Sequence, residues 1–457
     1  MGAALLFSEF EEAATGRASG FRPIYYLGCK AAFAAAIKSA IDEVDPSGGR
    51  ALDLFAGTGV VATYLAADRD VTTVDVQEYS RVLCAAALRP VGVSLGGIEK
   101  SCERVVAARW QAAWCFEPVV AFEEEVIVDA MKGDVCGLIE LLESPPLIAF
   151  SDEGQRVPDS RLGCAIEETI SRLTTTGLSK SEGTLVARSF GGVYFSFKQA
   201  VVLDAALSVA QAAGEELQDM LTAATLSTAS TLVNTVGKQF AQPIQPRTRS
   251  GIVKPGLAKR VYRDRSLDSI DVYRGWLKKY SELPCTNGRH QAVRSEYVDG
   301  LLKHGPNCSV VYADPPYTRD HYSRFYHVLE TMCLRDNPST SRVVKGGASM
   351  MSRGVYREDR HQSPFCIRSI APMAFEALFS RARQFDLPLV LSYSPHQEGD
   401  GTHPRVVSMK QIVDLAERHY RRVETRAVDG VKHNQLNRNG LKLKMRDQAE
   451  VIVKCFV

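Results

Sequence analysis

The spacing of apolar residues near the N-terminal end of the chain alternates between helical and strand patterns. Ala31–Val44 is an Ala-rich helical segment that stops before Pro46. Apolar and β-branched runs predict strands over 50–55 and 71–75, with a helix over 60–67 between them. A strand, a glycine turn, a helix and a second strand form a βαβ unit, and this unit favours a parallel sheet.

The same alternation returns in the last third of the chain. Short apolar runs predict strands over 309–313, 387–393 and 450–456, and 409–420 has a helical pattern. The simplest architecture is an α/β, Rossmann-like domain that is interrupted by a large insertion.

The predicted insertion has a different character from the two segments around it. We expect one domain to be formed by residues 22–90 and 291–457, and the inserted, mostly helical domain to span 91–290. The insertion is acidic over 116–168, whereas 247–294 is basic with interleaved aromatic residues. Such a basic stretch favours contact with phosphates, and its alternative is a solvated helix face.

Composition limits the function classes. A chain of 457 residues has room for two or three domains. The net charge of +2 gives no sign of nucleic-acid binding by itself, so such binding needs a local basic patch. Eleven cysteines include no Cys-x-x-Cys pair, which disfavours a zinc ribbon and a secreted disulfide scaffold, so we expect no metal site and a cytoplasmic location. We expect no signal peptide and no membrane span.

A glycine-containing turn after the first predicted strand is the candidate cofactor loop. Asp53 precedes Gly57 and Gly59, and the next strand ends at Asp75. Asp75 is placed to accept hydrogen bonds from ribose hydroxyls, with a helix N-cap as the alternative role. The dinucleotide pattern lacks its third glycine, and a carboxylate at Asp53 would repel a pyrophosphate but attract an ammonium. The loop therefore indicates S-adenosylmethionine rather than a nicotinamide dinucleotide.

The segment Asp314-Pro-Pro-Tyr317 follows the predicted strand 309–313. The amine of adenine is a weak nucleophile, and two acceptors aimed at its hydrogens favour its attack on a sulfonium methyl group. The Asp314 carboxylate and the Pro315 carbonyl supply such a pair, and two prolines restrict the backbone. Tyr317 offers a face on which an everted base can stack. The alternative is an ordinary turn after a strand.

In order and content these motifs resemble the Dam-like alpha class of DNA adenine-N6 methyltransferases. Pro23–Lys30 resembles motif X, and Val293–Asp299 resembles motif III. The resemblance implies a catalytic set of Asp314, Pro315, Pro316, Tyr317 and Lys30. It implies these cofactor-binding residues: Tyr26, Gly28, Lys30, Asp53, Phe55, Ala56, Gly57, Thr58, Gly59, Asp75, Glu296, Tyr297 and Asp314. Two departures are Cys29, where the family has a smaller residue, and the length of the insertion.

The resemblance also implies double-stranded DNA as the substrate, read by the insertion. Asn234, Lys238, Gln239 and Gln242 have side chains able to read base edges, and Asn or Gln can pair twice with adenine. We expect DNA contacts from Asn234, Lys238, Gln239, Arg247, Arg249, Tyr322 and Arg324. The basic, glycine-containing segment 345–364 is interpreted as a mobile loop that closes on DNA.

Several alternatives stay open at this stage. RNA guanine-N2 methyltransferases share an Asp-Pro-Pro-Tyr-like motif but carry little between their motifs, and cytosine-N4 enzymes more often have Ser in place of Asp314. A catalytically inactive DNA-binding relative and an unrelated oxidoreductase are the other classes. The sequence leaves open the recognition site, the oligomeric state and whether a restriction endonuclease or a phage-defence system accompanies the chain.

Overall fold

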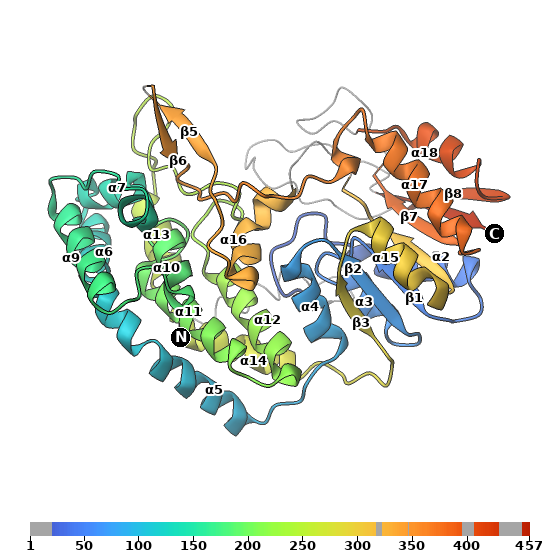
Figure 1. The fold of residues 1–457 in the computed structure, drawn as a ribbon, viewed down its shortest axis with the longest axis horizontal. Coiled ribbons are helices and arrows are strands. Elements are labelled where there is room, and N and C mark those ends of the chain that lie inside the picture. The colour runs from blue at the N-terminus through green and yellow to red at the C-terminus, as the bar shows by residue number, and fades with distance from the viewer. Residues whose placement is uncertain (1–20, 317–321, 346, 395–405, 429–449) are drawn as a thin grey trace. The chain divides into compact units, whose positions relative to one another are not determined.

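The computed structural model describes residues 21–316, 322–345, 347–394, 406–428 and 450–457. The chain divides into two compact units (Figure 1). The α/β unit comprises the described residues up to Val91, with Leu283–Ser323 and His361–Val457, and the helical unit comprises Gly92–Glu282 and Arg324–Arg360. Residues 324–360 therefore belong to the helical unit, whereas the sequence pattern predicted them within the α/β segment 291–457.

A seven-stranded sheet forms the centre of the α/β unit, in the order β3-β2-β1-β4-β7-β9-β8. The bounds of its strands are β1 Ala51–Leu54, β2 Val71–Asp75, β3 Gln291–Arg294, β4 Val310–Ala313, β7 Leu389–Tyr393, β8 Arg422–Val428 and β9 Glu450–Phe456. The first five in spatial order are parallel, and β9 runs antiparallel to both β7 and β8. This mostly parallel sheet agrees with the predicted α/β class and is consistent with a Rossmann-like domain.

Helices cover both faces of the sheet because its strands are apolar on both sides. On one face, Leu52, Val311 and Leu391 pack in a buried cluster with α15, α17 and α18. On the other face, Ala51 and Val310 pack in a second cluster with α2, α3 and α4. The bounds of these helices are α2 Ala34–Val44, α3 Val60–Leu65, α4 Glu78–Leu88, α15 Tyr297–His304, α17 Ala371–Gln384 and α18 Met409–Ala416, and short 3-10 turns lie at η1 Ala31–Phe33, η3 Gly305–Asn307 and η4 Pro364–Cys366.

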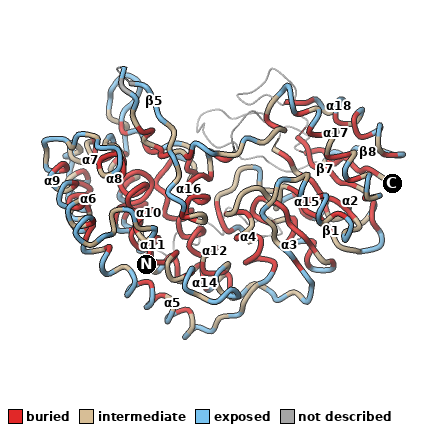
Figure 2. The backbone as a smooth tube through the Cα atoms, viewed as in Figure 1, coloured by how far each residue is buried: buried red, intermediate tan, exposed pale blue. Residues whose placement is uncertain are grey.

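The helical unit is built around two helices that are buried on most of their faces. Figure 2 shows buried residues along α11 Phe197–Gln211 and α12 Glu215–Leu232. The other helices of this unit are α5 Leu95–Ala108, α6 Trp110–Lys132, α7 Cys136–Glu143, α8 Leu147–Ser151, α9 Arg161–Thr175, η2 Glu182–Thr184, α10 Leu185–Phe190, α13 Leu257–Arg265, α14 Ser269–Ser281 and α16 Tyr322–Leu334. A buried ion pair between Arg265 and Glu123 lies between α13 and α6.

The segment predicted as a mobile loop contains regular structure. β5 Arg342–Lys345 and β6 Ala348–Met351 form an antiparallel hairpin in the helical unit. Arg353, which follows β6, donates to the carbonyl oxygens of Ser144 and Ile244. The loop interpretation is therefore wrong for this part of the segment. Within the described residues no helix is long and apolar enough to cross a bilayer.

Candidate active site

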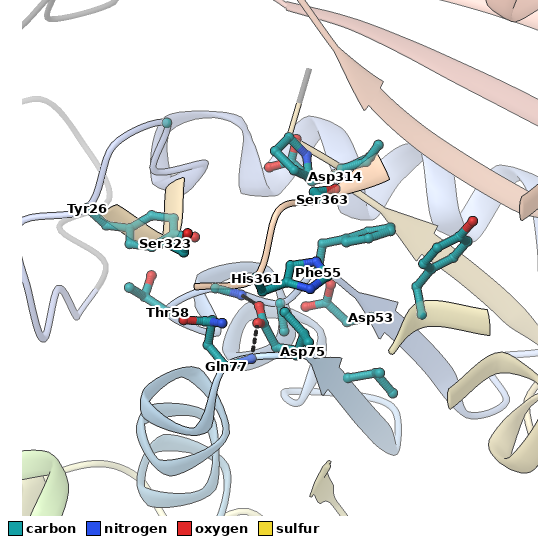
Figure 3. Close-up of a pocket in the computed structure, with 18 of the residues that line it drawn as sticks. Tyr26, Asp53, Phe55, Thr58, Asp75, Gln77, Asp314, Ser323, His361 and Ser363 are labelled. Carbon is teal, nitrogen blue, oxygen red and sulfur yellow. Dashed lines mark hydrogen bonds between the residues drawn. The ribbon is translucent and has the colours of Figure 1, made fainter. Parts of the chain in front are cut away.

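Loops after three neighbouring parallel strands line one cavity within the α/β unit. Leu54 of β1 is in register with Ala313 of β4 and with Val74 of β2, so the segments that follow these strands leave the sheet at the same edge. The space outside the protein atoms in this cavity, including its open mouth, is about 1260 Å³. Figure 3 shows Asp53, Asp75 and Asp314 around this space.

Most of the predicted cofactor and catalytic residues line this single cavity. They are Tyr26, Gly28, Lys30, Asp53, Phe55, Ala56, Gly57, Thr58, Asp75, Glu296, Tyr297, Asp314, Pro315 and Pro316. Gly59 lies one step away, as the N-cap of α3. Tyr317 lies outside the described residues.

The turn after β1 takes a backbone conformation that glycine favours. Gly57 and Gly59 have φ of 56° and 73°, and Phe55 between strand and turn has φ of 63°. A Cβ at Gly57 would lie 2.8 Å from the hydroxyl oxygen of Tyr26. The backbone of this turn can therefore come close to a ligand, and a larger residue at Gly57 would displace Tyr26.

Asp75 is held at the end of β2 by two backbone donors. Its carboxylate accepts from the N–H of Gly57 at 3.0 Å and from the N–H of Gln77 at 2.9 Å (Figure 3). Burial raises the pKa of Asp75, although these hydrogen bonds act in the opposite direction. A carboxylate has about four acceptor positions, so Asp75 retains capacity for two ligand hydroxyls.

Asp53 is a buried carboxylate that a backbone hydrogen bond from Ala62 compensates only in part. Its side chain is 1% exposed, and no described group donates to Oδ2. Burial raises the pKa of Asp53 well above its ordinary value, and the charges of Asp314 and Asp75 raise it further. A cation in the cavity would relieve this repulsion, which makes the site suited to a positively charged ligand.

Lys30 connects the Asp-Pro-Pro segment with the last strand of the sheet. Its ammonium is 5% exposed and lies 3.2 Å from Asp314 Oδ1 and 2.9 Å from Glu450 Oε1. Glu450 begins β9 and is fully buried. The sequence did not indicate that Glu450 belongs to the site, because a strand pattern alone does not show which residue a buried glutamate faces.

Three aromatic rings form an apolar wall of the cavity region. The Phe55 ring lies 5.4 Å from that of Tyr297 and 5.2 Å from that of Phe365, and the last two rings are 5.1 Å apart. Burial raises the pKa of Tyr297 to about 12, so its hydroxyl stays neutral. A wall of this kind fits a planar ring.

The segment before α17 supplies cavity residues that the sequence analysis did not single out. His361, Ser363 and Cys366 line the cavity, and so do Gln77 and Ser323. His361 Nδ1 lies 3.2 Å from Glu296 Oε1. No motif marked His361, Ser363 or Cys366, because they come from a segment without a periodic pattern.

The structure contradicts three of the predicted base-reading residues. Asn234 is fully buried and donates to Asp264 at 2.9 Å, and Gln239 is 5% exposed. Lys238 donates to Asp264 at 3.1 Å and to the carbonyl oxygens of Thr231 and Val233. Asn234 and Lys238 link the segment after α12 to Asp264 of α13, and the buried Asn234 and Gln239 have no access to DNA bases in this structure, whereas the Lys238 side chain is 18% exposed.

The remaining residues predicted to contact DNA are exposed, except for Tyr322, whose side chain the structure does not describe. Arg247 is exposed and lies 3.0 Å from Glu143, and Arg249 is exposed. Arg324 is exposed, and its guanidinium lies 4.7 Å from the centre of the Tyr356 ring. The side chain of Tyr322 lies outside what the structure describes.

Comparison with known proteins gives two matches. The family model for D12 class N6 adenine-specific DNA methyltransferases matches residues 26–110. The modification methylase LlaI of Lactococcus lactis subsp. lactis is 35% identical over 133 residues, which are 28% of this chain and 16% of that protein. The chain thus spans only a small part of the length of this relative. No solved structure matches the chain.

The family match covers the part of the cavity that comes from the N-terminal segment. It includes Tyr26, Lys30, Asp53 and Asp75 and ends before Asp314. It confirms the predicted resemblance to adenine-specific DNA methyltransferases for this segment.

Proposed function

We propose that this protein transfers a methyl group from S-adenosylmethionine to the exocyclic amine of adenine in double-stranded DNA. One observation carries the proposal: the Asp314-Pro-Pro segment and the Asp53, Gly57 and Asp75 loop line the same cavity. Separate cavities would have excluded direct transfer between ligands held by the two loops. The matches to an adenine-specific family and to a modification methylase support the same activity.

The residues of the cofactor side fit the chemistry of this methyl donor, which supplies an electrophilic methyl group on a positively charged sulfur. Asp75 has acceptors available for the two ribose hydroxyls. The only partly compensated carboxylate of Asp53 fits the ammonium group, and the wall of Phe55 and Tyr297 fits the purine ring.

On the other side of the cavity, Asp314 and the Pro315 carbonyl act on the target amine. They accept hydrogen bonds from its two hydrogens, which favours a tetrahedral nitrogen with an available lone pair. A bound methyl donor would supply the electrophilic carbon to this lone pair and would keep the electrons of the carbon–sulfur bond on its sulfur. One amine proton then leaves through Asp314. Lys30, at 3.2 Å, stabilises the ionised form of Asp314 that this role requires.

A base inside a duplex is not accessible to such a cavity, so the proposal includes eversion of the target adenine. We further propose that the helical unit supplies target recognition through exposed arginines such as Arg247 and Arg249 rather than through Asn234 or Gln239. The proposal also includes a restriction endonuclease or a phage-defence system as a partner. The neighbouring genes, or a pull-down with this protein, would test that part.

The first test is expression in a host that lacks adenine methylation, followed by modification-sensitive sequencing of its DNA. We expect N6-methyladenine at a defined sequence. Methylation of cytosine or of RNA, or its complete absence, would overturn the proposal.

The matched variants are Asp314→Ala and Asp299→Ala. Asp314→Ala should abolish methyl transfer and leave the Kd for S-adenosylmethionine within a few fold, because this carboxylate acts on the amine. Asp299 is exposed in the first turn of α15 and does not line the cavity, so its variant should keep wild-type turnover. Equal turnover of the Asp314 variant and the wild type would contradict the assigned role.

A further inference from the structure

Two arginines in the helical unit contact the same tyrosine ring. The Arg324 guanidinium lies 4.7 Å from the centre of the Tyr356 ring, and that of Arg360 lies 5.5 Å from it. Arg324 also donates to the Tyr356 hydroxyl at 3.3 Å. We call Arg324, Tyr356 and Arg360 the arginine–tyrosine cluster.

Tyr356 is held firmly enough to act as a platform. Its hydroxyl donates to the carbonyl oxygen of Ala241 at 2.5 Å. The ring of His327 lies 4.9 Å from the Tyr356 ring in an edge-on orientation, and His327 is buried. A guanidinium that stacks on a fixed ring keeps its plane, and with it the direction of its N–H groups.

No described carboxylate forms an ion pair with Arg324 or Arg360, although the charge of Asp359 partly offsets that of Arg360. The two nearby acids, Asp336 and Asp359, both pair with Arg357, at 2.7 Å and 2.8 Å. Arg360 donates to Ser341 Oγ at 3.0 Å and to the carbonyl oxygen of Arg357, which are neutral groups. Burial lowers the pKa of Arg360, and the charge of Arg324 lowers it further. Two guanidiniums that repel each other and share no anion form a site that an anion would stabilise.

Chain connectivity places the cluster beside the active-site segments. Arg324 directly follows Ser323 and Arg360 directly precedes His361, and both neighbours line the cavity. Consecutive Cα atoms lie about 3.8 Å apart. The two arginines are thus each covalently adjacent to a residue that lines the cavity.

We propose that the arginine–tyrosine cluster binds a backbone phosphate of duplex DNA next to the everted adenine. Guanidinium groups bind phosphate through paired N–H donors, and a phosphate contact fixes register without reading the base. This inference rests on the proposed function for the identity of the nucleotide, but not for the binding of DNA. Arg360 and Tyr356 thereby join Arg324 as residues that position the substrate.

The test measures duplex binding as a function of salt for the wild type, Arg324→Gln and Arg360→Gln. Each phosphate contact contributes about 0.9 to the slope of log K against log salt. We expect each variant to lower the magnitude of this slope by about 0.9 and to weaken binding by roughly three- to tenfold. Arg360→Lys should keep the slope, because it keeps the charge.

Arg161→Gln is the matched control in the same unit. Arg161 is exposed and lies 2.5 Å from Glu125, so its charge is already offset, and its variant should bind DNA like the wild type. Melting curves of all variants check that they are folded. Unchanged slopes in both cluster variants, or an equal change in Arg161→Gln, would overturn the proposal.

A second measurement leaves the protein unchanged. A duplex that contains the target is made with a neutral methylphosphonate in place of each phosphate around the adenine. A neutral linkage at one of these positions should weaken binding by the wild type. The same linkage should have little further effect on binding by the double variant of Arg324 and Arg360. If the slopes change but the wild type methylates no DNA, the proposed activity fails while the phosphate site stands. If methylation occurs and the slopes do not change, only the phosphate site fails.

Discussion

Replacement of Asp53 by asparagine should stabilise the ligand-free protein while it weakens cofactor binding. Asp53 is 1% exposed, and its Oδ2 accepts from no described group. A buried ionised acceptor that lacks donors costs about 1–3 kcal/mol, and asparagine cannot ionise, so the substitution removes the part of this cost that belongs to the charge. Each kcal/mol shifts the Tm of a domain of this size by about 2–4 °C. We therefore expect the Asp53→Asn protein to melt roughly 2–12 °C above the wild type at pH 8.

The sign of the pH dependence follows from the pKa of Asp53, which burial and the neighbouring carboxylates raise. An unfolded Asp has a pKa of about 3.9. Below that pH both states are protonated, and the carboxyl group carries no penalty. As the pH rises through the folded pKa, the folded state loses stability relative to the unfolded state. The advantage of Asp53→Asn should therefore vanish toward pH 4 and grow toward neutral pH.

Asp45 provides a control in which removal of the charge should lower the Tm rather than raise it. It is 6% exposed, and burial alone would raise its pKa, but hydrogen bonds from Ser309 and Ser47 and the charge of Arg69 lower it. Arg69 lies 3.0 Å from its Oδ2. Its stabilising effect is present above the unfolded pKa and is lost as the pH falls through the folded pKa. Asp45→Asn should therefore lower the Tm at neutral pH.

The assays are thermal melts between pH 4 and pH 8 and titration calorimetry with S-adenosylmethionine. A Tm of Asp53→Asn at or below the wild type at pH 8 would refute the view that Asp53 is an incompletely compensated charge. Unchanged affinity for S-adenosylmethionine would refute its role toward the ammonium group. A gain in stability with a loss of affinity would show that this carboxylate is kept for binding.

Three further substitutions test other parts of the cavity. Asp75→Ala should weaken S-adenosylmethionine binding by roughly 1–3 kcal/mol through the loss of the ribose acceptor, and an unchanged Kd in calorimetry would count against that role. Gly57→Ala should lower the free energy of unfolding by about 1–2 kcal/mol, because φ is 56° and the new Cβ meets Tyr26; an unchanged urea midpoint would contradict this. Glu450→Gln should cost about 3–5 kcal/mol by removing a buried partner of Lys30, and a stability like that of the wild type would show that Asp314 alone suffices.

Strands could be predicted from the sequence where their residues are buried, because burial requires an apolar run. β1, β2 and β4 are fully or almost fully buried apolar strands, and the predicted runs coincide with them to within about two residues. β3 and β8 escaped prediction because they lie at the two edges of the sheet, where many of their residues face solvent and the apolar signal is weak. That Asp53 and Asp314 line the same cavity could be expected, because the segments after neighbouring parallel strands leave the sheet at the same edge.

Side-chain partners far apart in sequence were the part that could not be predicted. Asn234 and Lys238 are residue types that can read base edges, yet both donate to Asp264 of α13, which lies 30 and 26 residues further along the chain. The choice between a surface and a buried role depends on that partner, and no spacing rule connects the two positions. The same holds for Glu450, whose identity as a buried acid becomes meaningful only beside Lys30.

The contact between Lys30 and Glu450 spans 420 residues of chain, and this separation has a consequence for biosynthesis. A ribosome makes the lysine 420 residues before the glutamate, so the ammonium lacks this counter-ion while the segment between them is being made. Closure of so long a loop is slow and entropically costly. The newly made protein should therefore complete the geometry of the proposed site only after β9 has inserted between β7 and β8.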